Sequence, residues 1–184
     1  MPQQPALTAD EQKLNDVWNE HLRAEFSAYS ADETVATMAA NPRNHLVPVM
    51  IGGDGKEEVH EFYAKYFLPQ IPPDMEIVPV SRTIGQGRLV DEIVARFTHT
   101  ISMDWTLPGI PPTGKRVEVA LVVVVQFDGD KMAHEHIYWD QASVLVQLGL
   151  LQSGGLPVVG AEGARSVLDR TIRLNELIRR TRAH

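Results

Sequence analysis

Apolar residues recur every three or four positions through the first part of the chain, and this pattern predicts three helices. The first helix covers about residues 9–28 and begins at Thr8, whose spacing from Glu11 fits a capping box. A second capping sequence opens a helix over residues 30–41, which a proline at the next position should end. The third helix, over residues 54–68, has a strongly aromatic side.

After residue 75 the pattern changes to alternation, which predicts four long strands, over residues 75–84, 88–105, 116–127 and 131–140. A shorter strand over residues 45–50 contains a proline and should therefore lie at an edge of the sheet. Because the long strands follow one another through short turns, they should form an antiparallel meander. Three helices followed by these strands predict an α+β fold, in which the helices cover one face of a curved sheet and leave a cavity between the layers.

The chain after residue 150 adds one more element. A loop with several glycines precedes a last helix over about residues 161–181, which has a partly apolar face and several arginines. A solvated charged face explains these arginines better than an anion-binding arm does. We expect one globular domain over residues 1–150, with residues 151–184 as a loop and helix that pack on the same domain.

Composition excludes several classes of protein. With 184 residues and no cysteine, the chain can bury a sizeable core but has no disulfide, thiolate zinc site or catalytic cysteine. The net charge of −7 argues against nucleic acid as a partner. Residues 1–5 lack the features of a signal peptide, and the longest apolar run, residues 119–125, is too short to span a membrane. We expect a cytoplasmic protein without a membrane partner.

The stretch over residues 131–140 holds the main candidates for chemistry. Strand alternation would place five of its side chains on one face: Met132, His134, His136, Tyr138 and Asp140. Asp140 would lie where the strand meets a short amphipathic helix over residues 141–148. A carboxylate there could be a general base, because desolvation in an apolar pocket raises its pKa toward neutrality. It could equally be the N-cap of that helix.

The other candidates are histidines and aromatic residues. His134 and His136 could bind a divalent metal with a carboxylate, as in cupins, but a cupin continues as a β-barrel where this chain turns helical. We therefore expect polar histidines at the pocket or the surface, and no tightly bound metal. His99 could point into the same cavity and donate to an oxyanion, or be a satisfied half-buried histidine. Trp18 and Tyr63 should belong to the pocket wall or the core.

Three features of the chain resemble a known family. They are the order of the elements, the segment 112–119 that enters a strand, and the segment 128–132 that leads to residues 138–141 and 147–149. Together they resemble the SnoaL-like group of the NTF2-like superfamily, which contains polyketide and ester cyclases. The resemblance covers about residues 10–150. It implies a cone, in which a curved antiparallel sheet surrounds a deep pocket closed by the N-terminal helices, and a dimer through the outer face of the sheet.

The resemblance also implies a site. In the cyclases an aspartate on the inner wall of the pocket removes an acidic C–H proton, and the matching residue here is Asp140. A neighbouring strand contributes polar partners, where this chain has Val124 and Gln126 in place of a histidine. The expected catalytic residues are Asp140, His136 and His99, and the expected pocket residues are His134, Tyr138, Gln126, Trp18 and Tyr63.

Three functions fit these observations. The chain could be a cofactor-independent cyclase, isomerase or hydrolase that acts on a small carbonyl-containing or aromatic compound. It could be a non-catalytic module that binds a hydrophobic ligand, or a structural domain with a filled pocket. A carboxylate–histidine cluster in an enclosed cavity would favour the enzyme, and an all-apolar cavity would favour the binding module. The apolar run over residues 120–125 should be buried on both faces, which predicts a homodimer.

Overall fold

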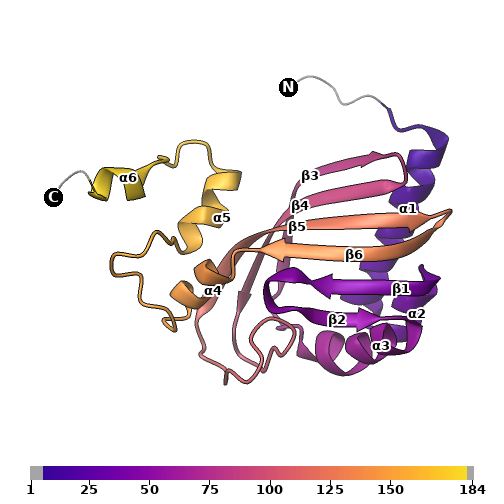
Figure 1. The fold of residues 1–184 in the computed structure, drawn as a ribbon, viewed down its shortest axis with the longest axis horizontal. Helices are drawn as coiled ribbons and strands as arrows, with labels where there is room; N and C mark the ends of the chain where they lie inside the picture. The colour runs from indigo at the N-terminus through magenta and orange to yellow at the C-terminus, as the bar shows by residue number, and fades with distance from the viewer. Residues whose placement is uncertain (1–5, 182–184) are drawn as a thin grey trace.

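Helices α1 to α3 cover one face of a six-stranded sheet in the computed structural model, which describes residues 6–181 (Figure 1). The helix α1, Ala9–Arg23, begins at the predicted capping box. There the Thr8 N–H donates to Glu11 Oε2 at 2.8 Å, and the Glu11 N–H donates to Thr8 Oγ1 at 3.3 Å. These two bonds satisfy backbone donors that the helix itself leaves unpaired, so the start of α1 is set locally by the sequence.

Two helices continue as wider, π-helical turns. The helix α1 runs into the π-helical segment Ala24–Ala28, and α3, Lys56–Glu61, runs into Phe62–Phe67. Segments of π-helix are rare and occur frequently at functional sites. Here they carry Glu25 and Tyr63, which meet in the cavity described below. The apolar spacing of the sequence predicts the helices but not this change in their winding.

The second helix is much shorter than predicted. Capped by the Ser30 hydroxyl, α2 covers only Ala31–Ala36, because a strand, β1, Met38–Leu46, follows it. This strand pairs in parallel with the last strand, β6, Lys131–Trp139. A long-range strand pairing therefore outweighs the local helical pattern.

The edge strand predicted over residues 45–50 is also wrong. One edge of the sheet is β2, Ile51–Asp54, and β1 lies between β2 and β6. Pro48 belongs to the short 3-10 turn Val47–Val49 that joins β1 to β2. Proline has no N–H to donate to a strand ladder, which explains why β1 ends before it.

The four long strands form the predicted antiparallel meander. The strand β3, Glu76–Gly85, pairs with β4, Arg88–Thr98, which pairs with β5, Arg116–Asp128, and β5 pairs with β6. The full order is β2-β1-β6-β5-β4-β3. The strand β4 ends before the predicted Trp105, which lies in a loop where its indole N–H donates to the Gln70 carbonyl at 3.0 Å.

A β-bulge interrupts β6 near its start. Met132 lies opposite Phe127 and His134 lies opposite Gln126, so Ala133 has no partner on β5. One extra residue reverses the inward and outward directions of every side chain that follows it. Met132 and Glu135 are consequently both buried, at 0% and 2% exposure.

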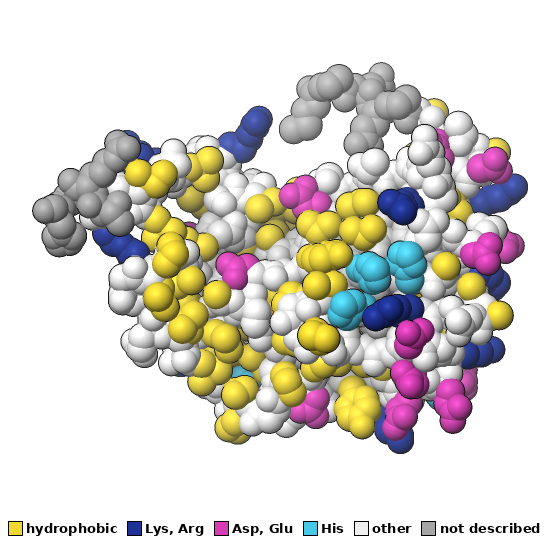
Figure 2. Space-filling model, viewed as in Figure 1, with side chains coloured by type: hydrophobic (Ala, Val, Ile, Leu, Met, Phe, Trp, Pro, Cys, Tyr) yellow, Lys and Arg dark blue, Asp and Glu magenta, His cyan; other side chains and the backbone are white. Residues whose placement is uncertain are grey.

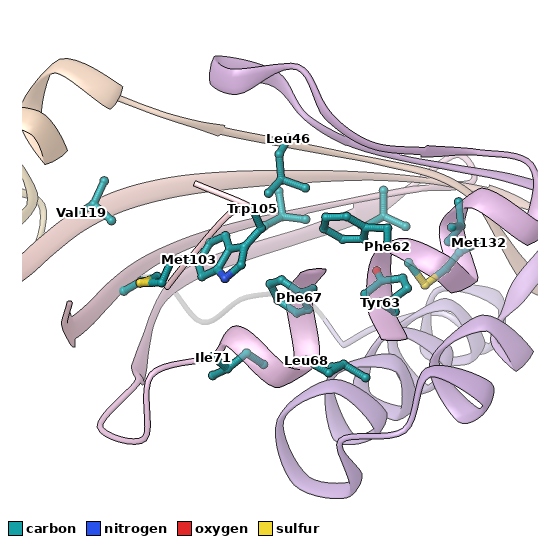
Figure 3. Close-up of a cluster of buried hydrophobic side chains, with 14 of the residues drawn as sticks. Leu46, Phe62, Tyr63, Phe67, Leu68, Ile71, Met103, Trp105, Val119 and Met132 are labelled. Carbon is teal, nitrogen blue, oxygen red and sulfur yellow. The ribbon is translucent and has the colours of Figure 1, made fainter. Parts of the chain in front are cut away.

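Side chains from both layers fill much of the space between the helices and the sheet. Phe62, Tyr63 and Phe67 point from their helix toward the sheet (Figure 3). Trp105 packs edge-on against Phe67, with ring centroids 5.2 Å apart. Leu46 of β1 is buried in the same cluster. The four aromatic side chains form one wall of the cavity.

Between β6 and residue 181 the chain forms three short helices at one end of the sheet (Figure 1). They are α4, Gln141–Gln147, α5, Ala161–Leu168, and α6, Glu176–Thr181, so a single helix over residues 161–181 is wrong. The helix α5 lies against β5, where Arg165 Nη2 donates to Glu118 Oε1 at 2.5 Å. The division at residue 150 stays a prediction.

No helix among residues 6–181 combines the length and the apolar character needed to cross a bilayer. The signal-peptide prediction concerned residues 1–5, which lie outside the described part of the chain.

Candidate functional site

A cavity of about 330 Å³ lies between the helices and the sheet. Its walls are largely apolar and aromatic, with contributions from Leu22, Phe26, Phe62, Phe67, Ile71, Ile93, Trp105, Ile137 and Trp139. Polar side chains reach it in two hydrogen-bonded groups, Glu25, Asn44, Tyr63 and Glu135 in the first and Arg82 and Asp91 in the second. A cavity with apolar walls and a few convergent polar groups is the usual form of a small-molecule site.

The first group is built around two carboxylates and one imidazole. Glu25 comes from the π-helical turn after α1, Glu135 from β6, and His21 from α1. His21 is fully buried, and Glu25 and Glu135 are only 4% and 2% exposed. His21 Nε2 lies 3.2 Å from Glu25 Oε1 and 3.7 Å from Glu135 Oε2. Carboxylates are rarely buried at this depth without a partner, and here one imidazole serves both.

The hydrogen bonds of Thr37 assign the protons of His21. The Thr37 hydroxyl donates to the Thr34 carbonyl at 2.7 Å, so it accepts from His21 Nδ1, which is also 2.7 Å away. His21 Nε2 then faces two carboxylates and, at 3.2 Å, the Tyr63 oxygen. Two carboxylates would repel a bare lone pair. Nε2 therefore carries a proton as well, and His21 is an imidazolium.

The pKa values in the cluster follow from burial and from this charge. Burial alone would lower the pKa of His21, but Glu25 and Glu135 outweigh it and raise that pKa to about 10. Burial raises the pKa of the Glu25 carboxyl group, although the His21 charge opposes the rise. Burial and the neighbouring carboxylates also raise the pKa of Tyr63, so the phenol keeps its proton. The positive charge of the imidazolium offsets the charge of the carboxyl groups, which limits the cost of burying the cluster.

Asn44 and Tyr63 complete the cluster at the cavity wall. Asn44 Nδ2 donates to Glu135 Oε2 at 2.9 Å and to the Tyr63 oxygen at 3.0 Å, and the Tyr63 hydroxyl donates to Glu135 Oε2 at 3.3 Å. Asn44 Oδ1 is buried and has no hydrogen-bond partner among the described residues. A buried acceptor without a partner is costly, so a ligand that offers an O–H or N–H to it would be favoured.

The second polar group ties α1 to the sheet. Arg82 donates from Nε and Nη2 to the two oxygens of Asp91, both at 2.6 Å, and the Trp18 indole N–H donates to Asp91 Oδ2 at 2.7 Å. Arg82 also donates to two asparagine side chains of α1 at 2.8 Å. The Trp18 ring stacks on His21 with centroids 5.4 Å apart, where its π face stabilises the imidazolium.

The same cluster could hold a metal ion. One ligand atom each from His21, Glu25 and Glu135 lies within 4.8 Å of the other two. A cation would take the position of the proton on His21 Nε2, so proton and cation exclude each other. With that proton in place, hydrogen bonds already join the imidazolium, the carboxylates, Asn44 and Tyr63.

The sequence pattern of the SnoaL-like polyketide cyclase family matches residues 11–148, which is more than half of the chain. The chain belongs to this family. The matched segment runs from α1 to the end of α4 and includes every element that lines the cavity. No curated protein matches the chain.

Solved structures share the fold at low sequence identity. A candidate SnoaL-like polyketide cyclase from Jannaschia sp. CCS1 is 16% identical, with a TM-score of 0.63 over 81% of this chain and 100% of that chain. AclR, a candidate hydroxylase from Streptomyces galilaeus, is 17% identical, with a TM-score of 0.57 over 77% and 88%. SalBIII, an epoxide hydrolase/cyclase-like enzyme in pyran ring formation of salinomycin, is 18% identical, with a TM-score of 0.52 over 72% and 94%. At these identities the likeness concerns the fold alone, and it confirms the predicted α+β, NTF2-like class.

In this SnoaL-like chain, two of the predicted pocket residues line the cavity, Trp18 and Tyr63. The candidates on β6 do not. His134, His136 and Tyr138 lie on the outer face of the sheet, because the bulge at Ala133 reverses the alternation that the sequence pattern assumed. Burial is the largest effect on both histidines and lowers the pKa of each, and nearby positive charges lower it further.

Gln126 and His99 also lie outside the cavity lining. Gln126 faces outward, where it accepts from Arg88 Nε at 2.6 Å and donates to the Gly87 carbonyl at 3.0 Å. His99 is buried in the loop after β4, where its Nδ1 accepts from the Thr113 N–H at 3.4 Å. Burial lowers the pKa of His99. His99 is therefore a buried histidine, as in the alternative, but its Nε2 has no hydrogen-bond partner among the described residues.

Asp140 is exposed and serves as the N-cap of α4. Its Oδ1 accepts from the Ser143 N–H at 3.2 Å. The position expected for it on the inner wall of the pocket is wrong, because β6 ends at Trp139 and the inward carboxylate of this strand is Glu135. The hydrogen bond of Asp140 fits the alternative that this residue is the N-cap of α4.

Glu25, Glu135 and the role of His21 were not predicted from the sequence. Glu25 had a readable signal, since it follows Trp18 and His21 at the spacing of one helix face and so falls on the buried side of α1. A carboxylate on an apolar helix face is unusual. Glu135 had no such signal, because its direction depends on the bulge.

We predict that Asp140 supports α4 and not catalysis. Asp140→Ala removes the cap and should lower the free energy of unfolding by about 1 kcal/mol, whereas Asp140→Asn keeps a capping side chain and should change it little. Both variants should keep the wild-type turnover of any substrate found. Chemical denaturation and steady-state kinetics measure the two effects, and a folded Asn variant without turnover would return Asp140 to the active site.

We predict that the charge on His21 makes stability fall at alkaline pH. Because the pKa of His21 is raised from 6.5 to about 10 in the folded state, its contribution is complete below about pH 6.5 and is lost as the pH rises through 10. The raised pKa of Glu25 acts in the same direction. The melting temperature should therefore drop between pH 7 and 10, and the drop should be shallower in His21→Gln. Equal slopes for the two proteins would contradict a charged His21.

Proposed function

We propose that this SnoaL-like protein is a cofactor-independent enzyme that transfers protons within a small carbonyl-containing or aromatic compound, as a cyclase, isomerase or hydrolase. The observation that carries this proposal is the pair of buried carboxylates, Glu25 and Glu135, on the wall of an apolar cavity, with the His21 imidazolium behind them. Paired titratable groups whose environments separate their protonation states are typical of acid–base catalysis.

The charge of His21 favours different catalytic roles for the two carboxyl groups. One imidazolium balances one carboxylate, so the second carboxyl group is favoured in its neutral form. Burial raises the pKa of Glu25, which makes it the group that holds the proton. Glu135 accepts hydrogen bonds from Asn44 and Tyr63, which hold its oxygens at the cavity wall. Glu135 is thus the proposed general base and Glu25 the proposed general acid.

A balanced proton transfer follows from these roles. A Glu135 oxygen takes the proton from a carbon next to the substrate carbonyl, and the electron pair of that C–H bond moves onto the carbonyl oxygen as an enolate. The Glu25 proton can stabilise this oxygen, and the Tyr63 hydroxyl, which donates to Glu135 in the free protein, can join it once Glu135 has taken up a proton. The enolate carbon can then attack a second carbonyl carbon of the same molecule and close a ring; the electron pair of that C=O bond moves to its oxygen, which takes up a proton. Alternatively, the enolate regains a proton at another carbon, which isomerises the compound.

The apolar walls suit a flat, largely uncharged compound. Aromatic side chains from both layers, Phe26, Phe62, Phe67, Trp105 and Trp139, surround the space beside the carboxylates. Such walls exclude water, which strengthens the electrostatic interactions inside and keeps an enolate from being protonated by solvent. The relatives named above as cyclases or hydrolase/cyclase-like enzymes support this reaction class but not a particular substrate.

A non-catalytic module that binds a hydrophobic ligand is the second candidate. It is favoured by the apolar character of most of the cavity wall. The two candidates differ in what the buried carboxylates do. In a binding module they would only fix a ligand, whereas in an enzyme they must exchange protons with it.

We predict that Glu135→Gln separates these candidates. Native mass spectrometry of freshly purified protein first identifies a bound compound or a substrate class to assay. Glu135→Gln keeps the shape of the side chain and a hydrogen-bonding oxygen but cannot take up a proton, so turnover should fall by about 10²–10⁴-fold with little change in ligand affinity. Asp140→Asn is the matched control and should keep turnover. Wild-type turnover in a folded Glu135→Gln variant would exclude Glu135 as the base.

We also propose that the protein forms a homodimer through the outer face of its sheet. Val122 and Tyr138 lie opposite each other on β5 and β6 and are 38% and 44% exposed, which is unusual for apolar side chains on central strands. A second copy that covers this stripe would bury them.

We predict that sedimentation finds a dimer at micromolar concentration, and that Tyr138→Glu converts it to a monomer by placing a charge in the contact. Tyr66→Glu is the matched control, because Tyr66 is equally exposed, at 44%, but belongs to the helical layer. A wild-type monomer would remove the proposal.

A further inference from the structure

Three histidine side chains meet on the outer face of the sheet, away from the cavity. Figure 2 shows them gathered beside arginine or lysine side chains and next to an apolar area. His134 and His136 come from β6 and stack with ring centroids 4.6 Å apart, and His45 of β1 lies edge-on to His136 at 5.6 Å. His45 and His136 are direct neighbours in the parallel ladder between these strands.

We propose that His45, His134 and His136 form a binding site for a divalent transition metal such as zinc or copper. Imidazole nitrogen is a preferred ligand of both ions, and three protein ligands with one open position is the arrangement of reactive zinc sites. The site lies on the opposite face of β6 from Glu135, so it is separate from the proposed acid–base centre.

The hydrogen bonds of the chain leave these three rings available. No hydrogen bond from residues 6–181 engages the ring nitrogens of His45, His134 or His136. Each of the other described histidines is engaged, His21 by Thr37, His60 by Asp32 and His99 by Thr113. Six nitrogen atoms on one small area of surface therefore have no partner within the described protein.

Strand geometry places the three side chains next to one another, but their ring nitrogens do not converge as they stand: among the described residues only His21, Glu25 and Glu135 place ligand atoms within 4.8 Å of one another. Side chains two residues apart on a strand project from the same face, and side chains opposite each other on neighbouring strands have Cβ atoms about 5 Å apart. The three Cβ atoms thus form a triangle with His136 at its corner. Rotation of half-buried rings about their side-chain bonds can turn one nitrogen of each toward a shared point, and the paired strands hold the Cα atoms in place.

The surrounding charges define the rest of the site. Arg43 lies opposite His134 on β1, and Arg88 approaches it from β4, so a cation here meets two positive side chains. Their repulsion lowers the affinity for the metal and favours an anion, such as chloride or a carboxylate, in the open coordination position. We therefore expect an exchangeable ion, which is compatible with the expectation of no tightly bound metal.

The sequence alone supplies only two of these ligands. The spacing of His134 and His136 is visible in the chain, but two imidazoles make a weak site. His45 becomes the third ligand only because β1 pairs in parallel with β6. His45→Ala is therefore the variant that distinguishes the proposed site from a simple histidine pair.

The experiment is zinc titration of the chelator-stripped full chain by isothermal calorimetry, with copper-loaded protein examined by electron paramagnetic resonance. We expect about one ion per chain and hyperfine splitting from more than one imidazole nitrogen. Loss of an outer partner of a metal ligand typically weakens binding about 10–100-fold, so loss of a ligand in His45→Ala or His136→Ala should weaken it at least that much. His60→Ala, which removes another exposed histidine, should bind like the wild type.

The variant Arg43→Gln should change the zinc affinity in the opposite direction. It removes a positive charge beside the site and should tighten zinc binding, while a site elsewhere on the chain would not respond. Absence of zinc binding, or wild-type affinity in His45→Ala, would overturn the proposal. Binding that is lost in Glu25→Gln and kept in His45→Ala would also overturn it, since the ion would then occupy the buried cluster around His21.

Discussion

The single unpaired residue in β6, Ala133, determines which chemistry each face of the sheet presents. Without it, the strand would turn His134 and His136 toward the helices and Glu135 toward solvent. With it, Glu135 reaches the cavity and the two histidines face outward. Bulges are positional features that re-aim side chains, and this one places a carboxylate and an imidazole pair on opposite sides of one strand.

The buried cluster around His21 is held together by charge. Two carboxylates in an apolar space would strongly favour neutral forms, and the imidazolium allows one of them to stay ionised. Thr37 fixes the ring from one side and Trp18 packs on its face, so the charge stays in place. Buried ion pairs are weak contributors to stability. Their presence beside a cavity is better explained by chemistry than by folding.

Local patterns predicted the parts of the fold that local forces determine. The capping residues Thr8 and Ser30, the aromatic side of α3 and the antiparallel meander were all predicted and are present. The strand β1 was not, because its conformation depends on pairing with β6, which is distant in the sequence. The π-helical turns and the bulge add single residues to regular elements, and periodicity alone does not reveal such additions.

The same difference between local and long-range signals explains which residues of the site could be predicted. Trp18 and Tyr63 were predicted as wall residues because aromatic side chains on an apolar helix face point inward wherever the helix packs. Asp140 was selected by its position in a pattern, although its immediate neighbours already allowed a cap. Glu25 could have been found by asking which polar side chain shares a helix face with Trp18. Glu135 required the register of β6, which only the assembled sheet defines.

The parallel pairing of β1 with β6 also bears on the order in which the protein folds. Asn44 and Glu135, which are 91 residues apart, are joined only when the last strand docks beside the first. Contacts of such separation close late, because the loop entropy must be lost before they contribute. Until then His21 and Glu25 remain hydrated, and the cavity has no inner wall on that side. Docking of β6 therefore dehydrates the charges, closes the cavity and divides the two faces in one cooperative step, so a partly folded chain would have no acid–base centre.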